Sequence, residues 1–150
     1  MEISNYAEEK IKEFEGLRLT AYKCSAGKWT IGWGHTRTTK KGGKITTEEA
    51  QKFFEEDIQA VEEQLRREPY YQNLGDSQRD ALVSFTFNVR WRDFQSSTLR
   101  KKLMRDVGDS TIPDEFRRWV YATNPKTGKK EKLPGLVKRR EWEAQMYEDL

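Results

Sequence analysis

Apolar residues recur at helical spacing through most of this chain. Ala7, Ile11 and Phe14 lie three or four positions apart, which predicts a helix over residues 5–15 with Ser4 or Asn5 as its N-cap. A longer stripe runs from Ala50 to Leu65, behind a Thr46-Thr47-Glu48-Glu49 capping box. It predicts a helix of roughly 20 residues that ends before Pro69 and links two lobes.

The segment from Thr20 to Thr36 has a different pattern. β-Branched and aromatic residues alternate with Gly27, Gly32 and Gly34, which predicts short strands and tight turns. This segment is too short for a sandwich or a barrel. The chain is therefore predicted to be α+β and mostly helical, with a small N-terminal β-sheet lobe beside a helical body.

The rest of the chain reads as helices separated by clear breaks. Each predicted helix begins at a residue that favours helix starts: Asp76, Ser96 or Ser97, Pro113 and Gly135. The Pro113 helix carries Phe116, Trp119 and Val120. Residues 124–132 contain Pro125 and Gly128 and are predicted to be a polar loop.

Composition narrows the class of protein. The net charge is +3, and the second half is the basic half: residues 76–150 carry 16 basic and 12 acidic side chains, against 12 and 13 in residues 1–75. A basic face attracts nucleic acid, membrane or anionic wall polymer, although a solvated surface is the simpler interpretation. One Cys excludes an intrachain disulfide, and one His argues against a His-rich zinc site. We find no signal-peptide or membrane-spanning apolar run.

Several residues in the first fifth of the chain could carry chemistry. Glu15 follows Phe14 at the end of the predicted helix, where partial burial would favour a protonated acid. On spacing alone, a surface glutamate is the simpler interpretation of Glu15, because the same predicted helix also carries Glu8, Glu9 and Glu13. Cys24, Thr30 and His35 are individually typical of a buried thiol, a strand former and a structural hydrogen-bonding residue.

Together these residues form a recognisable pattern: Glu, eight residues, Cys, five residues, Thr, within EGLRLTAYKC and GKWTIGWGHT. This pattern closely resembles the phage-type lysozymes, the T4-like muramidases of glycoside hydrolase family 24. The resemblance covers nearly the whole chain, because four later segments match in order: Asp80–Val89, Phe94–Leu99, Phe116–Trp119 and Leu133–Arg140.

The resemblance implies one lysozyme-like catalytic domain over residues 1–150, with a β-containing lobe at roughly 15–50 and a helical lobe at roughly 65–150 plus the N-terminal helix. It implies hydrolysis of the β-1,4 bond between N-acetylmuramic acid and N-acetylglucosamine in peptidoglycan, with inversion and without a metal or organic cofactor. Glu15 would be the general acid and Thr30 would hold the attacking water. The residues expected to bind substrate are Trp33, Gly34, His35, Thr36, Phe87 and Thr98.

Two positions depart from the family pattern. Arg90 stands where members commonly have Gly, which bears on the local turn and on sugar binding near it. Cys24 stands where most members have Asp, and a thiol is mostly neutral at pH 7. We therefore expect Cys24 to work as a thiolate, either as a base or as an electrostatic partner. The rival is a thiolate nucleophile that forms a covalent sugar intermediate with retention.

Two other functions stay open at this stage. One is a cell-wall amidase or peptidase that uses Cys24 and His35. The other is a non-catalytic wall or nucleic-acid binder, in which Lys138-Arg139-Arg140 or Arg100-Lys101-Lys102 meets phosphates, although both runs also suit solvated helix faces.

The resemblance itself implies a monomeric lysis enzyme made in the host bacterial cytoplasm. It would act on the glycan strands of the wall without binding nucleic acid or inserting into the membrane. With no signal peptide in the sequence, it would need a separate holin-like pore to reach the wall.

Overall fold

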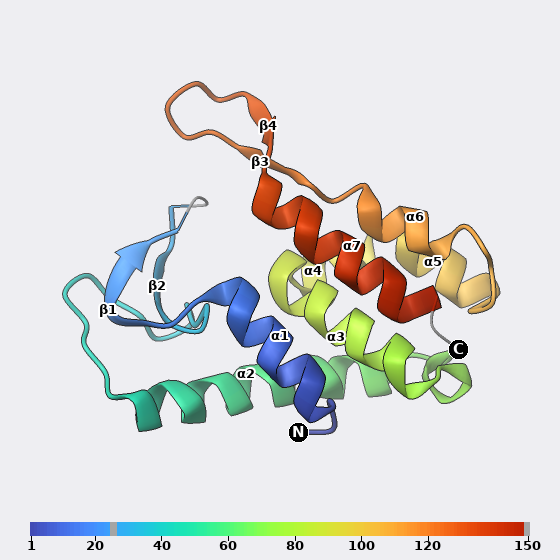
Figure 1. Ribbon diagram of the computed structural model, residues 1–150, viewed down its shortest axis with the longest axis horizontal. Helices are drawn as coiled ribbons and strands as arrows, with labels where there is room; N and C mark the ends of the chain where they lie inside the picture. Colours follow the sequence, from blue (N-terminus) through green and yellow to red (C-terminus); the bar gives the residue numbers. More distant parts are fainter. Residues whose placement is uncertain (25–26, 149–150) are drawn as a thin grey trace.

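The computed structural model describes residues 1–24 and 27–148, which fold mostly into helices with two small antiparallel sheets (Figure 1). The helices are α1 (Asn5–Glu15), α2 (Thr47–Arg66), α3 (Asp76–Val89), α4 (Trp91–Gln95), α5 (Thr98–Arg105), α6 (Ile112–Arg117) and α7 (Pro134–Glu148), with a 3₁₀ turn at Tyr71–Asn73. The strands are β1 (Arg18–Lys23), β2 (Trp29–Gly32), β3 (Tyr121–Thr123) and β4 (Lys130–Lys132).

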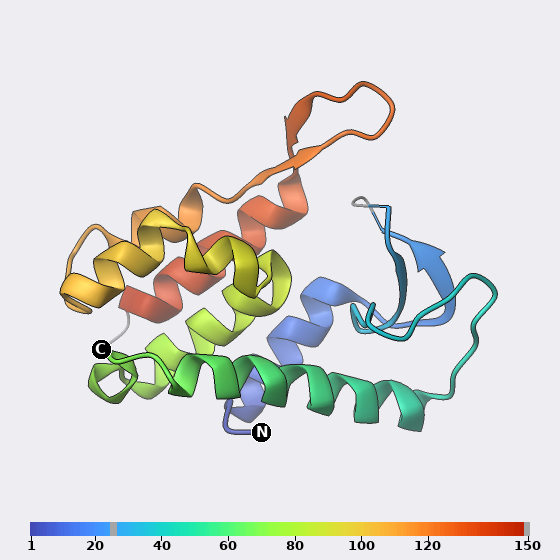
Figure 2. The same cartoon turned by 180° about the vertical axis from the view of Figure 1, so that it is seen from behind.

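The predicted α+β fold class is confirmed. Figures 1 and 2 show β1 and β2 at one end of the molecule and α3 to α7 at the other, with α2 running beneath both. The β1–β2 sheet pairs Arg18 with Gly32 and Tyr22 with Thr30, with an irregular register between them. The long helix α2 therefore joins the sheet lobe to the helical lobe.

The first two helices begin where the sequence predicts. The Ser4 hydroxyl accepts a hydrogen bond from the amide of Ala7 at 3.1 Å and so caps α1. At α2, the Thr46 hydroxyl accepts from the Glu49 amide, and the Glu49 carboxylate accepts from the Thr46 amide, both at 3.1 Å. This reciprocal pair is the predicted capping box.

Helix α3 forms the centre of the core. Most of its residues are buried, so it shows no amphipathic stripe. Phe85 packs edge-on against Phe116 and Trp119, with ring centroids 5.3 and 5.7 Å away. Phe87 contacts Phe54 of α2 at 5.9 Å. The two faces of α3 therefore hold α6 and α2 in place.

Two predicted helix boundaries were wrong in detail, at α3 and α6, and the predicted cap of α5 was confirmed. Asp76 does not cap α3: Gly75 precedes the helix, and its amide donates to the Gln78 side chain at 2.9 Å. Helix α6 has its proline in the first turn as predicted but ends at Arg117, before Trp119 and Val120. At α5 the cap is Ser97, whose hydroxyl accepts from the Arg100 amide at 3.1 Å.

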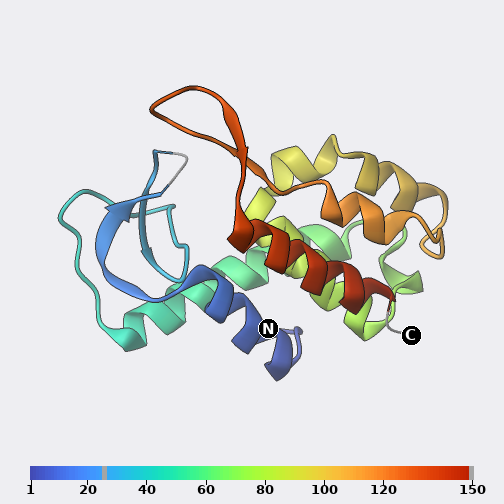
Figure 3. The same ribbon diagram turned by 45° about the horizontal axis from the view of Figure 1, so that its top comes forward.

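The predicted polar loop at residues 124–132 holds for residues 124–129 but was wrong for residues 130–132, which form strand β4. Tyr121, Ala122 and Thr123 pair with Lys132, Glu131 and Lys130 in a β3–β4 hairpin that extends from the start of α7 toward the sheet end of the molecule (Figure 3). Five of these six residues are exposed, so no apolar alternation marks the strands. The short helix α4 was likewise not predicted.

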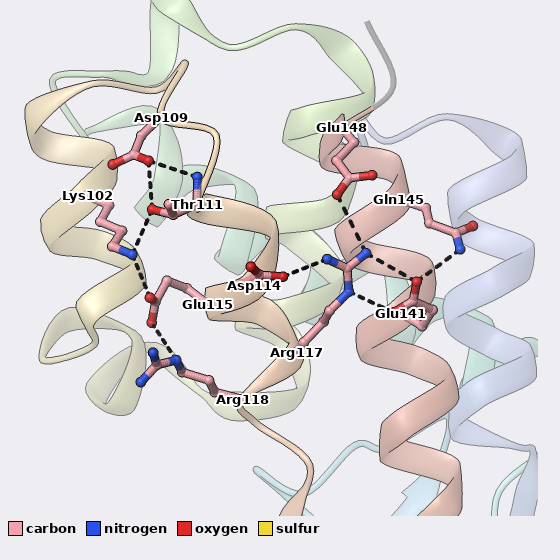
Figure 4. A network of polar contacts seen from close by, with 10 residues as sticks. All are labelled: Lys102, Asp109, Thr111, Asp114, Glu115, Arg117, Arg118, Glu141, Gln145 and Glu148. Carbon is pink, nitrogen blue, oxygen red and sulfur yellow. Dashed lines mark hydrogen bonds and ion pairs between the residues drawn. The ribbon is translucent and has the colours of Figure 1, made fainter.

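A surface network ties α5, α6 and α7 together (Figure 4). Arg117 of α6 donates to Glu141 of α7 at 2.7 Å and to Asp114 at 2.8 Å. Hydrogen bonding to Glu141 raises the pKa of Arg117. Lys102 of α5 meets Glu115 at 2.6 Å, which accounts for one of the basic runs as an ion-paired helix face.

No helix in the described residues has both the length and the apolar character needed to cross a membrane.

The α2 capping box gives the first prediction. Thr46→Ala removes the acceptor for the Glu49 amide and should cost about 1 kcal/mol of folding free energy, which lowers Tm by about 2–4 °C in a domain of this size. Thermal unfolding followed by circular dichroism measures the change. Thr47→Ala, at the neighbouring exposed threonine inside α2, is the control and should leave Tm nearly unchanged. Equal Tm values for the two variants would contradict the capping role.

Candidate active site

Glu15 is the last residue of α1, at the junction with the sheet. Gly16 follows with φ 71° and ψ 146°, a conformation that ends the helix and directs the chain into β1. The Glu15 side chain is only 15% exposed, and its Oε2 lies 2.5 Å from Nη1 of Arg139 in α7. One carboxylate thus links the first and last helices.

Arg139 is held from several directions. Its Nε and Nη2 donate to the hydroxyl and the carbonyl of Ser84 at 3.2 and 3.1 Å. The Ser84 hydroxyl donates to Glu143 at 2.6 Å, so Arg139 and Glu143 share this partner.

Arg140, the next residue, is also held by several contacts. It pairs with Glu143 at 2.6 Å, and it donates to the Trp119 carbonyl at 2.9 Å and to the Asn88 side chain. Burial lowers the pKa of Arg140, while the attraction of Glu143 opposes that shift.

These contacts correct an interpretation of the sequence. Arg139 and Arg140 are 3% and 1% exposed, so this part of the basic run is neither a solvated helix face nor available to phosphates. Sequence reasoning missed Arg139 as a site residue. The signal was present in the Leu133–Arg140 segment, but only the fold shows that Arg139 points at Glu15.

A tight loop supports Glu15 from the sheet side. The backbones of Ile31 and His35 exchange two hydrogen bonds at 2.9 Å, and the loop between them contains Gly32 and Gly34 at φ 64° and 75°. A Cβ on Gly34 would lie 2.5 Å from Oε1 of Glu15 and 3.5 Å from the Phe87 ring. Glycine is therefore required here by close approach as well as by conformation.

The structure brings Cys24 and Thr30 together through one carbonyl group. The Lys28 carbonyl accepts from the Cys24 amide at 2.9 Å and from the Thr30 hydroxyl at 3.0 Å. Thr30 is 3% exposed, and Cys24 is half-buried. The Thr30 side chain and the Cys24 backbone are thus fixed at the end of the β1–β2 pair.

Tyr22 connects this pair to Glu15. It lies opposite Thr30 in the sheet. Burial raises the pKa of Tyr22, and the nearby charges of Glu15 and Cys24 raise it further, while Arg18 lowers it. Both groups are therefore within electrostatic range of one phenol. Sequence reasoning did not single out Tyr22, because nothing in its local pattern distinguishes it from an ordinary strand residue.

Trp33 and His35 are engaged in packing. Trp33 meets Phe54 edge-on at 5.9 Å and carries the Lys12 ammonium 4.4 Å above its ring. The His35 ring is 2% exposed, and its nitrogens lie 2.8 Å from Asp57 and from Thr38. It also stacks on Phe53 at 4.3 Å. Both side chains are thus used in packing, and neither lines the two hollows of about 400 and 600 Å³ near the end of α3.

Thr36 and Phe87 line one hollow of about 400 Å³, together with Lys28 and Arg90. Phe87 is only 2% exposed, so it combines a core position with a place at the cleft. Thr98 is exposed at the first position of α5 and lines neither this hollow nor the next.

A second hollow of about 600 Å³ lies beneath the β3–β4 hairpin. Gly27, Asn88 and Val89 line this second hollow. Their sequence neighbours Lys28 and Phe87 line the first. The two hollows therefore adjoin at the end of α3 and the β1–β2 turn. Glu15 lines neither hollow. Gly34 beside it approaches Phe87 of the first hollow, and its partner Arg139 is the sequence neighbour of Arg140 in the second.

Within residues 1–24 and 27–148, no three His, Cys, Asp or Glu side chains gather where they could hold a metal ion.

The fold, with a glutamate between a small sheet and a helical lobe, defines a glycoside hydrolase of the lysozyme class. Residues 12–143 match the family model described as phage lysozyme, and the chain belongs to that family.

Related proteins cover nearly the whole chain. The endolysin of Acyrthosiphon pisum secondary endosymbiont phage 1 is 44% identical over 152 residues, which span 99% of each chain. The endolysin from Escherichia coli O157:H7 phage FAHEc1 superposes with TM-score 0.80 at 33% identity, covering 99% of this chain and 94% of that one. The muramidase domain of SpmX from Asticaccaulis excentricus superposes with TM-score 0.79 at 32% identity, covering 97% and 96%.

The close approach of Gly34 to Glu15 gives the second prediction. In Gly34→Ala the new methyl group must displace the Glu15 carboxylate, and a misplacement of about 1 Å can lower the rate about 10²-fold. Wall-lysis rates measure this loss.

Gly42→Ala is the matched control for Gly34→Ala. Gly42 has φ 82° but open space around its Cβ position, so it carries similar backbone strain without the clash. Both variants should lose stability, and only Gly34→Ala should lose activity. Equal activity in the two would show that the carboxylate position does not matter.

Proposed function

We propose that this chain is a muramidase that hydrolyses the β-1,4 bond between N-acetylmuramic acid and N-acetylglucosamine in peptidoglycan, with Glu15 as the general acid. The observation that carries the proposal is the position of Glu15, which Arg139 and Gly34 fix at the junction of the two lobes. The relatives named as endolysins and as a muramidase domain support this class of substrate.

Proton transfer from Glu15 to the leaving oxygen creates a carboxylate at this point. Arg139 lies 2.5 Å from that carboxylate and stabilises the developing negative charge. Because Ser84 already holds the guanidinium, little reorganisation is needed when the proton moves. Glu15 thus has a preorganised partner for the state it enters during the reaction.

Thr30 and Cys24 would handle the water that attacks the sugar carbon. The Thr30 hydroxyl donates its proton to the Lys28 carbonyl, so its oxygen is left to accept a hydrogen bond from water. Cys24, held by the same carbonyl through its amide, would act as a thiolate that orients and activates this water. Attack by water gives inversion at the anomeric carbon.

The geometry argues against a Cys24–His35 amidase or peptidase. Such an enzyme needs a histidine nitrogen that is available to the thiol. Both nitrogens of His35 lie 2.8 Å from other side chains, and the ring is buried against Phe53. A His35→Ala variant with full activity would exclude this alternative.

A purely binding role also has little support. Arg139 and Arg140 are buried, and Arg100 and Lys102 are paired with Glu68 and Glu115. These four cations are buried or ion-paired within the molecule and so do not form a phosphate-binding surface.

We further propose that the enzyme works as a monomer. Like a phage lysis enzyme made in host cytoplasm, it would reach the wall through a separate pore.

The third prediction concerns Glu15. Replacing a general acid typically lowers the rate about 10²–10⁴-fold, and Glu15→Gln keeps the size of the side chain. Mass spectrometry of borohydride-reduced wall fragments should show new muramic acid ends with the parent and almost none with the variant. New free amines on intact glycan strands would instead indicate an amidase or peptidase.

The fourth prediction concerns Cys24. Cys24→Asp should retain activity, because a carboxylate supplies the same negative charge, whereas Cys24→Ala should lose about 10²-fold or more. Lysis rates of both variants, and the anomer that NMR detects first, measure these outcomes. A retained configuration would favour a thiolate nucleophile over a base, and full activity in Cys24→Ala would contradict both roles.

A further inference from the structure

Arg90 has an unusual backbone conformation at the turn between α3 and α4. Its φ is 83° and its ψ is 150°, and it is the one non-glycine residue with positive φ among residues 1–24 and 27–148. L-residues with side chains strongly disfavour this region, and such strain tends to occur at functional sites. Arg90 thus has a backbone conformation that glycine would adopt without strain.

The turn itself does not need an arginine. The Arg90 amide donates to the Thr86 carbonyl at 2.9 Å, and its own carbonyl accepts from the Phe94 amide at 3.0 Å. A glycine would make both backbone hydrogen bonds without strain. What arginine adds is its exposed, positively charged side chain.

Arg90 lines the hollow of about 400 Å³ that Thr36 and Phe87 also line. Lys28 and Arg37 line the same hollow, so three cations face it. Its one carboxylate among the described residues, Asp57, is already engaged by His35 at 2.8 Å and by Arg37 at 3.5 Å.

The positive charge of the hollow is therefore not neutralised from within the molecule. In the part of the chain that the structure describes, neither Lys28 nor Arg90 has an ion-pair partner within 4 Å. Trp91 and Val61 add apolar surface beside the cations. This combination suits a ligand with carboxylates and small apolar groups.

The hollow also lies close to the proposed acid. Phe87, which lines it, is the residue whose ring would lie 3.5 Å from a Cβ on Gly34, and Gly34 in turn touches Glu15. A substituent of a sugar strand bound at Glu15 would therefore lie next to this hollow. The stem peptide of peptidoglycan has the required chemistry, since it is a short chain rich in alanine and in free carboxylates.

We propose that Arg90, assisted by Lys28, binds a carboxylate of the peptidoglycan stem peptide and thereby sets the preference of the enzyme for acidic, peptide-bearing strands. This proposal rests on the muramidase function proposed above. A guanidinium pairs with a carboxylate through two parallel hydrogen bonds, which gives direction as well as affinity. The strain at Arg90 is retained because a glycine could not make this contact.

The test compares native wall with wall whose carboxylates have been converted to amides by carbodiimide and ammonia. Arg90→Gln and Arg90→Lys keep a comparable side-chain length and the same backbone strain, and differ in charge. On native wall Arg90→Gln should lower kcat/KM about tenfold through KM, and Arg90→Lys should fall between Arg90→Gln and the parent, because lysine keeps the charge and loses the second parallel hydrogen bond. On amidated wall all three should be alike, and added salt should shrink the difference on native wall.

Arg90→Gly separates the two roles of the residue. It removes the unfavourable φ and should raise Tm by a few degrees, about 2–4 °C, while losing as much activity on native wall as Arg90→Gln. Arg92→Gln, at an exposed arginine of α4, is the matched control and should change neither property.

Sedimentation with each wall preparation measures binding separately from cleavage. Parent-like kinetics and binding for Arg90→Gln on native wall, or an equal loss on both walls, would overturn the stem-peptide proposal. If the parent bound native wall more tightly than amidated wall through Arg90 but released no muramic acid ends, the muramidase proposal would fail while the carboxylate site would stand.

Discussion

The pairing of Arg139 with Glu15 is the contact on which the rest of the site depends. It joins α7 to the end of α1, across 124 positions of sequence. Desolvating a guanidinium is costly, and a buried ion pair on balance adds little stability compared with apolar packing. The main role of the pair is therefore to fix a position, because it places the Glu15 carboxyl group at one point between the lobes. Ser84 accepts from Nε and Nη2 of Arg139, and Glu143 lies 3.5 Å from Nε.

Helix α3 supports Glu15 from both sides. Ser84 holds Arg139 on one face of the helix, and Phe87, three residues later, packs beneath the Gly34 loop on another. Because α3 is buried among α2, α6 and α7, these two supports cannot move independently. The packed core thus fixes the position of the proposed acid, as preorganised electrostatic catalysis requires.

Local rules predicted much of the fold. Three features depend only on residues close in sequence and are therefore visible in the sequence itself: the cap at Ser4, the capping box at Thr46 and the apolar stripe of α2. The β3–β4 hairpin was missed because its strands are short and exposed. The motif led to Glu15, Cys24 and Thr30, but Arg139 was read as a surface charge because its partners lie 55 and 124 positions away.

The features that break local rules gather around the cleft. Arg90 takes a conformation that suits glycine, two arginines of α7 are buried, and Glu15 sits where α1 must stop. Far from the cleft, at the start of α2, sequence preference and structure agree. A chain folds readily when the local preferences of its residues agree with its tertiary structure. Residues whose preferences disagree with the structure are retained where function rather than folding selects them. The distribution of these conflicts therefore supports the proposed site by an argument that does not depend on similarity to other proteins.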